Sequence, residues 1–285
     1  MEINIEKIQK EKPIKELLKF SIINLDKPTG PTSFSVSQYV KNALEINKTS
    51  HAGTLDPQVS GVLPVMLGRA CRLSDYFMHR NKTYVGIMRL HLDVKDNELK
   101  VEIKNFIGKI MQLPPVRSRV KREIREREIV SFNILEREGK DILFETEVQA
   151  GTYIRKLCDD IGKKIGGAHM LELRRVKAGI FQEKDSINLY DFEKAVEEYK
   201  KGDEKELRKI LIPGEIISKV LPVVQIKSDN LKKILTGKPL FNEDILEKPK
   251  SLSSPFAAFL GDRFIGCYKL VEDGDIFAKA EFVFN

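Results

Sequence analysis

Residues 50–65 form the segment that most constrains this chain, and they read SHAGTLDPQVSGVLPV. A glycine, a threonine, an acid and a proline lie within five residues, and a short apolar run follows. This pattern predicts a tight loop that leads into a buried strand, with Asp56 at the tip of the loop. Considered alone, Asp56 is an ordinary turn residue, because aspartate before proline favours turn initiation and short motifs are often coincidental.

Four motifs in a fixed order change that interpretation. The string HAGTLDPxxSGVLPV resembles the catalytic loop of the TruB/Cbf5 (dyskerin) family of pseudouridine synthases. Three further strings resemble motifs of the same family: LDKPTGPTS at 25–33, GTYIR at 151–155 and LRRVKAG at 173–179. Four matches in family order across about 155 residues leave little room for coincidence.

The resemblance implies that Asp56 is the catalytic residue and that Arg155 pairs with it. Isomerising uridine to pseudouridine breaks the C1′–N1 bond, rotates the uracil and rejoins it through C5, without a redox step, a metal or a group donor. The reaction needs one carboxylate held ionised in a pocket that excludes water. Burial disfavours an ionised carboxylate and a nearby guanidinium favours it, so a buried catalytic aspartate is expected beside an arginine.

The same resemblance implies four substrate-binding residues. Tyr84 would stack on the flipped base, as expected for an enzyme that takes a base out of a folded RNA. His51 would contact the displaced RNA, Leu173 would line the apolar side of the pocket, and Lys27 belongs to the set through the first motif. From the residues alone, Tyr84 and Leu173 are equally consistent with core positions, and His51 with a histidine that only satisfies the turn.

Composition narrows the function class further. A net charge of +7 and an isoelectric point near 9.1 fit a polyanion binder, although many basic proteins bind no nucleic acid. The sequence has neither a GxxxxGK[ST] loop nor a GxGxxG motif after a strand, and its four histidines are scattered. The three cysteines Cys71, Cys158 and Cys267 are widely spaced without a CxxC pair, so we expect free thiols, no metal site and no cofactor.

The elements predict an α+β protein with two domains. Residues 20–213 are expected to form a pseudouridine synthase catalytic domain on a mixed or antiparallel sheet, and Ile212-Pro213-Gly214 mark its end. Residues 214–285 are strand-rich and resemble a PUA domain, a small RNA-binding β-barrel. In archaeal members of the family the N-terminal segment packs on the C-terminal domain, and the resemblance implies this for residues 1–19.

Local patterns give more detailed expectations. Residues 69–80 are amphipathic and predict a helix. Residues 83–94 alternate and predict a half-buried strand whose inner face includes Leu92. Residues 113–128 form the most basic local stretch, which is either a solvated charged face or an RNA-contacting segment. Arg119 stands there where the family usually has a small residue.

The motifs look closer to archaeal Cbf5 and dyskerin than to bacterial TruB, notably GPTS at 30–33 and GTYIRKLCDDIG at 151–162. This branch implies the catalytic subunit of an H/ACA ribonucleoprotein with the partners Nop10, Gar1 and L7Ae. A guide RNA would select uridines in rRNA or tRNA. A stand-alone tRNA T-loop pseudouridine synthase is the alternative within the family, and a non-catalytic RNA-binding scaffold is the alternative outside enzymes. Retention of both Asp56 and Arg155 argues against a scaffold, because a purely structural protein needs neither.

The chain is expected to be cytoplasmic, or nucleolar in a eukaryote. Its longest apolar runs fall short of a membrane span, and its Lys/Glu-rich N-terminus lacks an apolar signal core.

Overall fold

The computed structural model describes residues 2–114 and 121–285. Within that part of the chain, eleven strands form one large sheet. These strands are β1 (Ser21–Lys27), β2 (Thr49–His51), β3 (Ser60–Leu67), β4 (Lys82–Leu90), β5 (Gly108–Gln112), β6 (Arg125–Glu138), β7 (Asp141–Val148), β8 (Ala168–Ala178), β9 (Phe181–Gln182), β10 (Ile187–Asn188) and β11 (Ile212–Pro213).

The main path of the large sheet runs β10-β1-β3-β8-β4-β7-β6-β5. The neighbours β1 and β10 pair in parallel, as do β3 and β8, whereas β1 and β3, β4 and β8, and β6 and β7 pair antiparallel. The sheet is therefore mixed, as predicted. The pairing of β3 with β8 brings the strand after the Asp56 loop beside the strand of the LRRVKAG motif.

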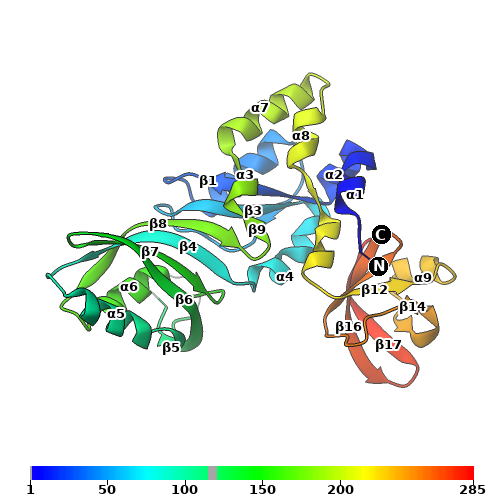
Figure 1. Ribbon diagram of the computed structural model, residues 1–285. Helices are drawn as coiled ribbons and strands as arrows, with labels where there is room; N and C mark the ends of the chain where they lie inside the picture. The colour runs from blue at the N-terminus through cyan, green and yellow to red at the C-terminus, as the bar shows by residue number, and fades with distance from the viewer. Residues whose placement is uncertain (1, 115–120) are drawn as a thin grey trace.

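Two groups of helices lie at the two ends of this sheet (Figure 1). α3 (Ser33–Ala43), α7 (Leu189–Lys200) and α8 (Lys205–Ile210) lie at the β1 end, and α5 (Asp96–Asn105) and α6 (Ile154–Gly162) lie beside β5 to β8. Capping fixes where two of them begin. Thr32 accepts a hydrogen bond from the Ser35 amide before α3, and Asn188 does the same for Asp191 before α7.

A second sheet forms the C-terminal part of the chain and confirms the expected PUA-like, barrel-like fold. Its six strands follow the order β13-β17-β16-β15-β12-β14. Their bounds are β12 (Val223–Ile226), β13 (Leu240–Phe241), β14 (Ile245–Glu247), β15 (Phe256–Leu260), β16 (Arg263–Asp273) and β17 (Ile276–Val283). The short helix α9 (Leu231–Leu235) packs Ile234 into the core of this sheet.

The two sheets share a hydrophobic core. Phe20, just before β1, stacks on Phe264 of β16 with ring centroids 5.3 Å apart and contacts Phe284 at 4.2 Å. The 3₁₀ helix η3 (Gly214–Lys219) connects the sheets and adds Ile216 and Ile217 to the same cluster. The two parts are therefore packed together rather than tethered by a free linker.

The N-terminal segment contains α1 (Ile5–Glu11) and α2 (Ile14–Lys19) and lies where the two sheets meet. Ile3 joins the shared core, and Lys12 forms an ion pair of 2.7 Å with the buried Glu215 of η3. The side-chain amide of Gln9 donates to the carbonyls of Arg208 in α8 and of Leu211 just after it. The segment thus contacts both parts of the molecule.

Residues 69–80 do not form the predicted single helix. They lie in a 3₁₀ helix, η1 (Gly68–Leu73), followed by the short α4 (Ser74–Met78). Gly68 has a φ of +54°, and a Cβ there would lie 2.5 Å from the Lys19 carbonyl oxygen, so close packing against α2 sets the turn. The Arg69 guanidinium lies 4.8 Å above the ring of Phe284. Tertiary contacts therefore override the helical periodicity.

The strand predicted for residues 83–94 ends early. β4 stops at Leu90, and the His91 amide donates to the Gly167 carbonyl, which turns the chain away from the sheet. Leu92 consequently lies 56% exposed instead of in the core. Of the basic stretch at 113–128, residues 115–120, including Arg119, lie outside the described residues.

Candidate active site

The Asp56 loop connects a two-stranded hairpin. β2 pairs antiparallel with β3, and residues 52–59 form the connection between them. The Val59 amide donates to the Asp56 carbonyl at 3.0 Å, which closes a tight turn. Gly53 has a φ of +97°, a conformation that glycine adopts without strain. The predicted loop and its following buried strand are both present.

Lys27 of the LDKPTGPTS motif supports this loop through hydrogen bonds. The Lys27 ammonium donates to the carbonyls of Pro28, Pro31 and Pro57 at 2.8, 2.9 and 3.3 Å. The Gly30 amide donates to the same Pro57 carbonyl at 2.8 Å. Because Pro57 follows Asp56 directly, these bonds fix the backbone beside the acid.

Ser33 provides a second support on the other side of Asp56. Its hydroxyl accepts from the Leu55 amide at 2.8 Å and donates to the Leu55 carbonyl at 3.1 Å, and the side chain is buried. The residues on both sides of Asp56, Leu55 and Pro57, are thus anchored to residues 27–33. The LDKPTGPTS motif acts as a clamp on the Asp56 loop.

The structure brings Asp56 and Arg155 together, 99 residues apart in the chain. The Arg155 Nη2 donates to Asp56 Oδ2 at 2.8 Å. The Asp56 side chain is 55% exposed and the Arg155 side chain 51% exposed. The expectation of a buried aspartate is therefore wrong for the free chain, because loop and helix meet at the surface of the sheet.

Positive charge is concentrated at the end of α6 that carries Arg155. The first turn contains Arg155 and Lys156 without an acidic residue, and the last turn contains no basic one. This order opposes the helix dipole, which favours acids at the N-terminus and bases at the C-terminus. The arrangement costs helix stability and places Arg155 and the positive end of the dipole where the Asp56 carboxylate lies.

A buried arginine lies directly beneath the loop. The Arg175 guanidinium donates to the carbonyls of Val62 at 2.8 Å and Gly53 at 3.0 Å. A Cβ on Gly61 would lie 2.2 Å from the Arg175 carbonyl oxygen, so only glycine permits this approach of β3 to β8. Sequence reasoning missed Arg175. Its available signal was a basic residue at an inward position of the LRRVKAG strand.

Burial acts on three basic groups in this region. It lowers the pKa of Lys82 to about 8 and also lowers the pKa of Arg175. His51 has a lowered pKa because it is largely buried and lies near the Arg175 charge. Among the described residues, the buried carboxylates are Glu215 and Asp244, both in the C-terminal part, so carbonyl groups satisfy these cations.

Burial also lowers the pKa of Lys27, and attraction to the charge of Asp56 partly offsets that effect. Lys27 is fully buried, and its ammonium is used by three carbonyls. The free chain therefore uses the Lys27 side chain inside the protein, and the predicted contact of Lys27 with substrate stays a prediction. Its place in the structure is that of a loop support.

The other predicted substrate contacts lie close to the site or in the core. His51 ends β2 and lies 3.3 Å from the Thr54 hydroxyl through Nε2. Tyr84 is 9% exposed, and its hydroxyl favours the charged form of Arg175 beneath the loop. Leu173 is 8% exposed and packs over Gly86. Base stacking by Tyr84 and pocket lining by Leu173 stay predictions.

The described residues 2–114 and 121–285 contain no group of three or more His, Cys, Asp or Glu side chains placed to hold a metal ion. The cysteines Cys71, Cys158 and Cys267 are free thiols. In the same part of the chain, no helix combines the length and the apolar character that crossing a membrane requires.

Comparison with known families covers most of the chain. Residues 41–154 match the family described as TruB family pseudouridylate synthase (N terminal domain), and residues 155–218 match the tRNA pseudouridylate synthase B C-terminal domain. Residues 10–37 match the DKCLD (NUC011) domain.

Relatives agree with that assignment. A protein of Methanocaldococcus jannaschii named "Probable tRNA pseudouridine synthase B" is 42% identical over 244 residues, which cover 85% of this chain and 73% of the relative. A protein of the same name from Methanopyrus kandleri is 43% identical over 244 residues, covering 85% and 72%.

Solved structures show the same fold. The chain matches one in a Cbf5-Nop10-Gar1 complex with a TM-score of 0.89 and 37% identity over 97% of this chain and 88% of the other. It matches a chain in an H/ACA RNP bound to a substrate RNA with a TM-score of 0.87 and 35% identity over 97% and 89%. The motifs, the fold and these relatives together show that the chain belongs to the TruB/Cbf5 family of pseudouridine synthases, which are RNA isomerases.

Proposed function

We propose that the chain is the catalytic subunit of a guide-directed pseudouridine synthase, with Asp56 as its catalytic carboxylate. The observation that carries this proposal is the 2.8 Å contact between Asp56 and Arg155. Two motifs far apart in sequence deliver a paired acid and base to an exposed position, where a base extruded from an RNA can reach them. A structural ion pair would need neither the exposure nor the clamped loop.

The residues around the pair have distinct tasks in this proposal. Arg155 orients the Asp56 carboxylate for nucleophilic or general-base catalysis through their 2.8 Å contact. Lys27 and Ser33 hold the backbone of Pro57 and Leu55 on the two sides of Asp56, so the acid meets the substrate in one position. Tyr84, His51 and Leu173 contact the flipped uridine or the RNA next to it.

The reaction balances without a second substrate. The C1′–N1 bond breaks, a C1′–C5 bond forms, and the proton lost from C5 is balanced by one gained at N1. Asp56 is the protein side chain that takes part in these reaction steps. Since Asp56 is half exposed in the free chain, the bound RNA must cover the pair to exclude water during the reaction.

Partner dependence follows from the same exposure. A site that the chain leaves open cannot by itself select one uridine, so base pairing with a guide RNA would supply the sequence specificity. The similar solved structures include a Cbf5-Nop10-Gar1 complex and an H/ACA RNP with substrate RNA. We therefore propose Nop10, Gar1 and an H/ACA guide RNA as partners, with L7Ae implied by the family resemblance.

A stand-alone tRNA enzyme is the second candidate, because the curated relatives carry the name tRNA pseudouridine synthase B. One assay separates the two. Pseudouridine formation is measured in single turnover on a guide-complementary RNA and on a bare T-loop RNA, each with and without guide RNA, Nop10, Gar1 and L7Ae. We expect slow turnover by the chain alone and strong stimulation by guide and partners. Full activity on the bare T-loop, unaffected by guide and partners, would replace this proposal with the tRNA enzyme.

The same assay tests Asp56. Asp56→Asn should abolish product while RNA affinity stays within a few-fold, because the amide keeps the shape and removes the charge. Asp159→Asn is the matched control, since Asp159 is a 50% exposed acid of α6 that also pairs with basic side chains. Turnover by Asp56→Asn at a few per cent of the wild-type rate, with deamidation excluded, would remove Asp56 from its role. A wild type that is inactive even with guide and partners would favour the non-catalytic scaffold.

A further inference from the structure

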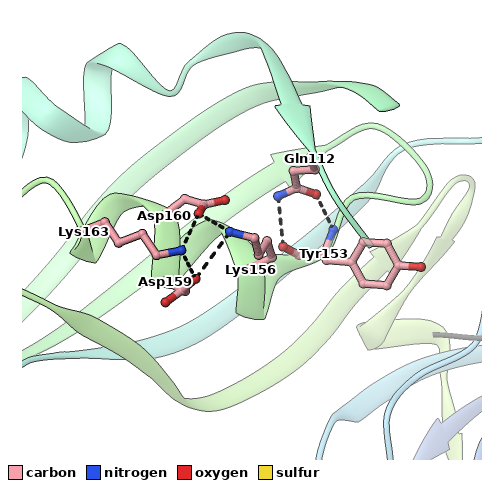
Figure 2. Close-up of polar contacts among 6 residues, drawn as sticks. All are labelled: Gln112, Tyr153, Lys156, Asp159, Asp160 and Lys163. Carbon is pink, nitrogen blue, oxygen red and sulfur yellow. Dashed lines mark hydrogen bonds and ion pairs between the residues drawn. The ribbon is translucent and has the colours of Figure 1, made fainter. Parts of the chain in front are cut away.

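Gln112, the last residue of β5, is nearly buried at 2% exposure and contacts the GTYIR motif (Figure 2). Its side-chain amide donates to the Tyr153 carbonyl at 3.2 Å and accepts from the Tyr153 amide at 3.0 Å. We propose that Gln112 is a positioning residue that fixes the start of α6 and thereby sets Arg155 against Asp56. This inference rests on the function proposed above.

The start of α6 needs such support because it lacks the usual one. Tyr153 occupies the N-cap position, and no side chain of the cap residue bonds to the first turn. Serine, threonine, aspartate or asparagine would normally fill this position and satisfy an amide there. The Tyr153 carbonyl accepts the first helical bond, from Leu157 at 2.9 Å, and Gln112 takes up the Tyr153 amide.

The charges of α6 make external support more important. Lys156 and Lys163 bind Asp159 and Asp160 along one side of the helix, as Figure 2 shows. These pairs join neighbouring turns. Lys156 precedes its acids, an order that opposes the helix dipole, whereas Lys163 follows them, which the dipole favours. The pairs do not reach the segment before Ile154. The two Gln112 bonds connect this segment to the sheet.

Gln112 connects the sheet to the start of α6 and can therefore restrain the position of Arg155. Its backbone pairs with Arg125 of β6, so the residue cannot shift without breaking the ladder. Arg155 follows Tyr153 by two residues, and its guanidinium must meet Asp56 at hydrogen-bond distance. Two bonds to one peptide group fix both position and rotation at the point where the helix begins. A side chain that must align with a reacting group gains most from that restraint.

Gln112→Met tests the inference. Methionine has a similar length and suits a buried site, but it can neither donate to nor accept from the Tyr153 backbone. We expect the single-turnover rate in the assembled complex to fall about tenfold to a hundredfold. RNA affinity should stay within about twofold, because Gln112 lies under the motif and not at the surface.

The chain offers a closely matched control in Gln225 of β12. Gln225 is 3% exposed and makes the same reciprocal pair of bonds, donating to the Gly261 carbonyl at 3.1 Å and accepting from the Gly261 amide at 3.0 Å. Gln225→Met removes equivalent bonds in the C-terminal sheet. It should reduce stability by a similar amount and leave the rate per folded molecule unchanged.

Coupling to Arg155 separates positioning from general destabilisation. In an Arg155→Ala background, Gln112→Met should lower the rate by less than about twofold, because the side chain it positions is gone. A wild-type rate for folded Gln112→Met would overturn the inference. So would an undiminished further loss in the Arg155→Ala background.

Rates are normalised to the folded fraction from near-UV circular dichroism. Should Gln112→Met not fold, the same criteria apply to Gln112→Glu, which keeps an acceptor for the Tyr153 amide and should be about threefold to tenfold slower than wild type. An inactive wild type, or an active Asp56→Asn, would contradict the proposed function. An active wild type with an unaffected Gln112 variant would contradict only this inference.

Discussion

Three basic side chains beneath the Asp56 loop are buried, where a charged group loses the free energy of hydration. They are Lys27, Lys82 and Arg175, and each donates hydrogen bonds to backbone carbonyls. Carbonyl dipoles replace part of the lost hydration but do not cancel the charge. The result is a positive region under Asp56, which favours an anion above it and a polyanionic substrate around it.

Lys82 should make stability depend on pH. Its folded-state pKa is about 8, below the ordinary value of 10.5, so above pH 8 the unfolded chain holds a proton that the folded chain has released. The free energy of unfolding should therefore rise with pH, by about 2 kcal/mol between pH 7 and 9.5 from this group. Below pH 7 both states are protonated and the contribution is flat.

Urea unfolding of wild type and Lys82→Met at several pH values measures the contribution of Lys82 to the pH dependence of the unfolding free energy. The difference in unfolding free energy should move in favour of wild type as pH rises, whereas Lys100→Met, at an exposed lysine of α5, should follow wild type in parallel. Parallel curves for Lys82→Met would show that Lys82 keeps its proton at pH 9.5.

At the scale of elements, α3 does more than cover the sheet. Its cap residue Thr32 and its first residue Ser33 come directly from the turn that Lys27 organises. The helix start, the turn and the Asp56 loop are thus one hydrogen-bonded unit. A change at the start of α3 should reach the active site without touching any residue that contacts RNA.

Ser33→Ala should show this. It removes the acceptor of the Leu55 amide and leaves that group buried without a partner, at a cost of about 1–3 kcal/mol in unfolding free energy. It should also slow the chemical step about tenfold, because Asp56 loses one of its two supports.

Ser37→Ala is the control from the same helix. Ser37 is also buried, and its hydroxyl bonds to Thr49 at 3.0 Å instead of to the loop. This variant should lose comparable stability and keep the wild-type rate per folded molecule. Equal rates for the two variants would mean that Ser33 supports only the fold.

Sequence predicted the elements whose own pattern decides their structure. Residues 191–201 carry apolar side chains at helical spacing, and residues 137–140 form a turn between two strand-like segments; these elements are present as α7 and as the β6–β7 pair. The structure of residues 69–80 could not be predicted in this way, because it depends on the contact of Arg69 with Phe284, which is far away in the chain. The same limit applies to the site. Motifs identified Asp56 and Arg155 as candidates. The roles of Lys27 and Arg175 depend on their burial, and the sequence alone does not show that a charged residue is buried.

At the scale of the whole molecule, the shared core changes how the C-terminal part can be studied. Phe20, Ile217 and Phe264 belong to one cluster that spans both sheets. Removing residues 214–285 would expose this cluster and disturb the catalytic part as well. Surface substitutions are the better probe of RNA binding by the PUA-like domain.

Charge is also unevenly distributed over the molecule. Residues 214–285 contain equal numbers of basic and acidic residues, so the net charge of +7 is carried by residues 1–213. RNA binding by the PUA-like domain cannot come from its overall charge. It must come from a local cluster, and α9 provides one in the exposed Lys232 and Lys233, with Lys238 shortly after.

Changing Lys232 and Lys233 together to alanine tests that cluster. Each lost phosphate contact should weaken guide-RNA affinity and reduce the slope of log affinity against log salt by about one. Filter binding across a salt series measures both quantities. The exposed pair Lys100 and Lys104 of α5, changed in the same way, controls for the loss of two charges elsewhere. If affinity and slope stay at wild-type values in the α9 variant, α9 does not contact phosphate, and the C-terminal sheet contributes through the core it shares with the catalytic part.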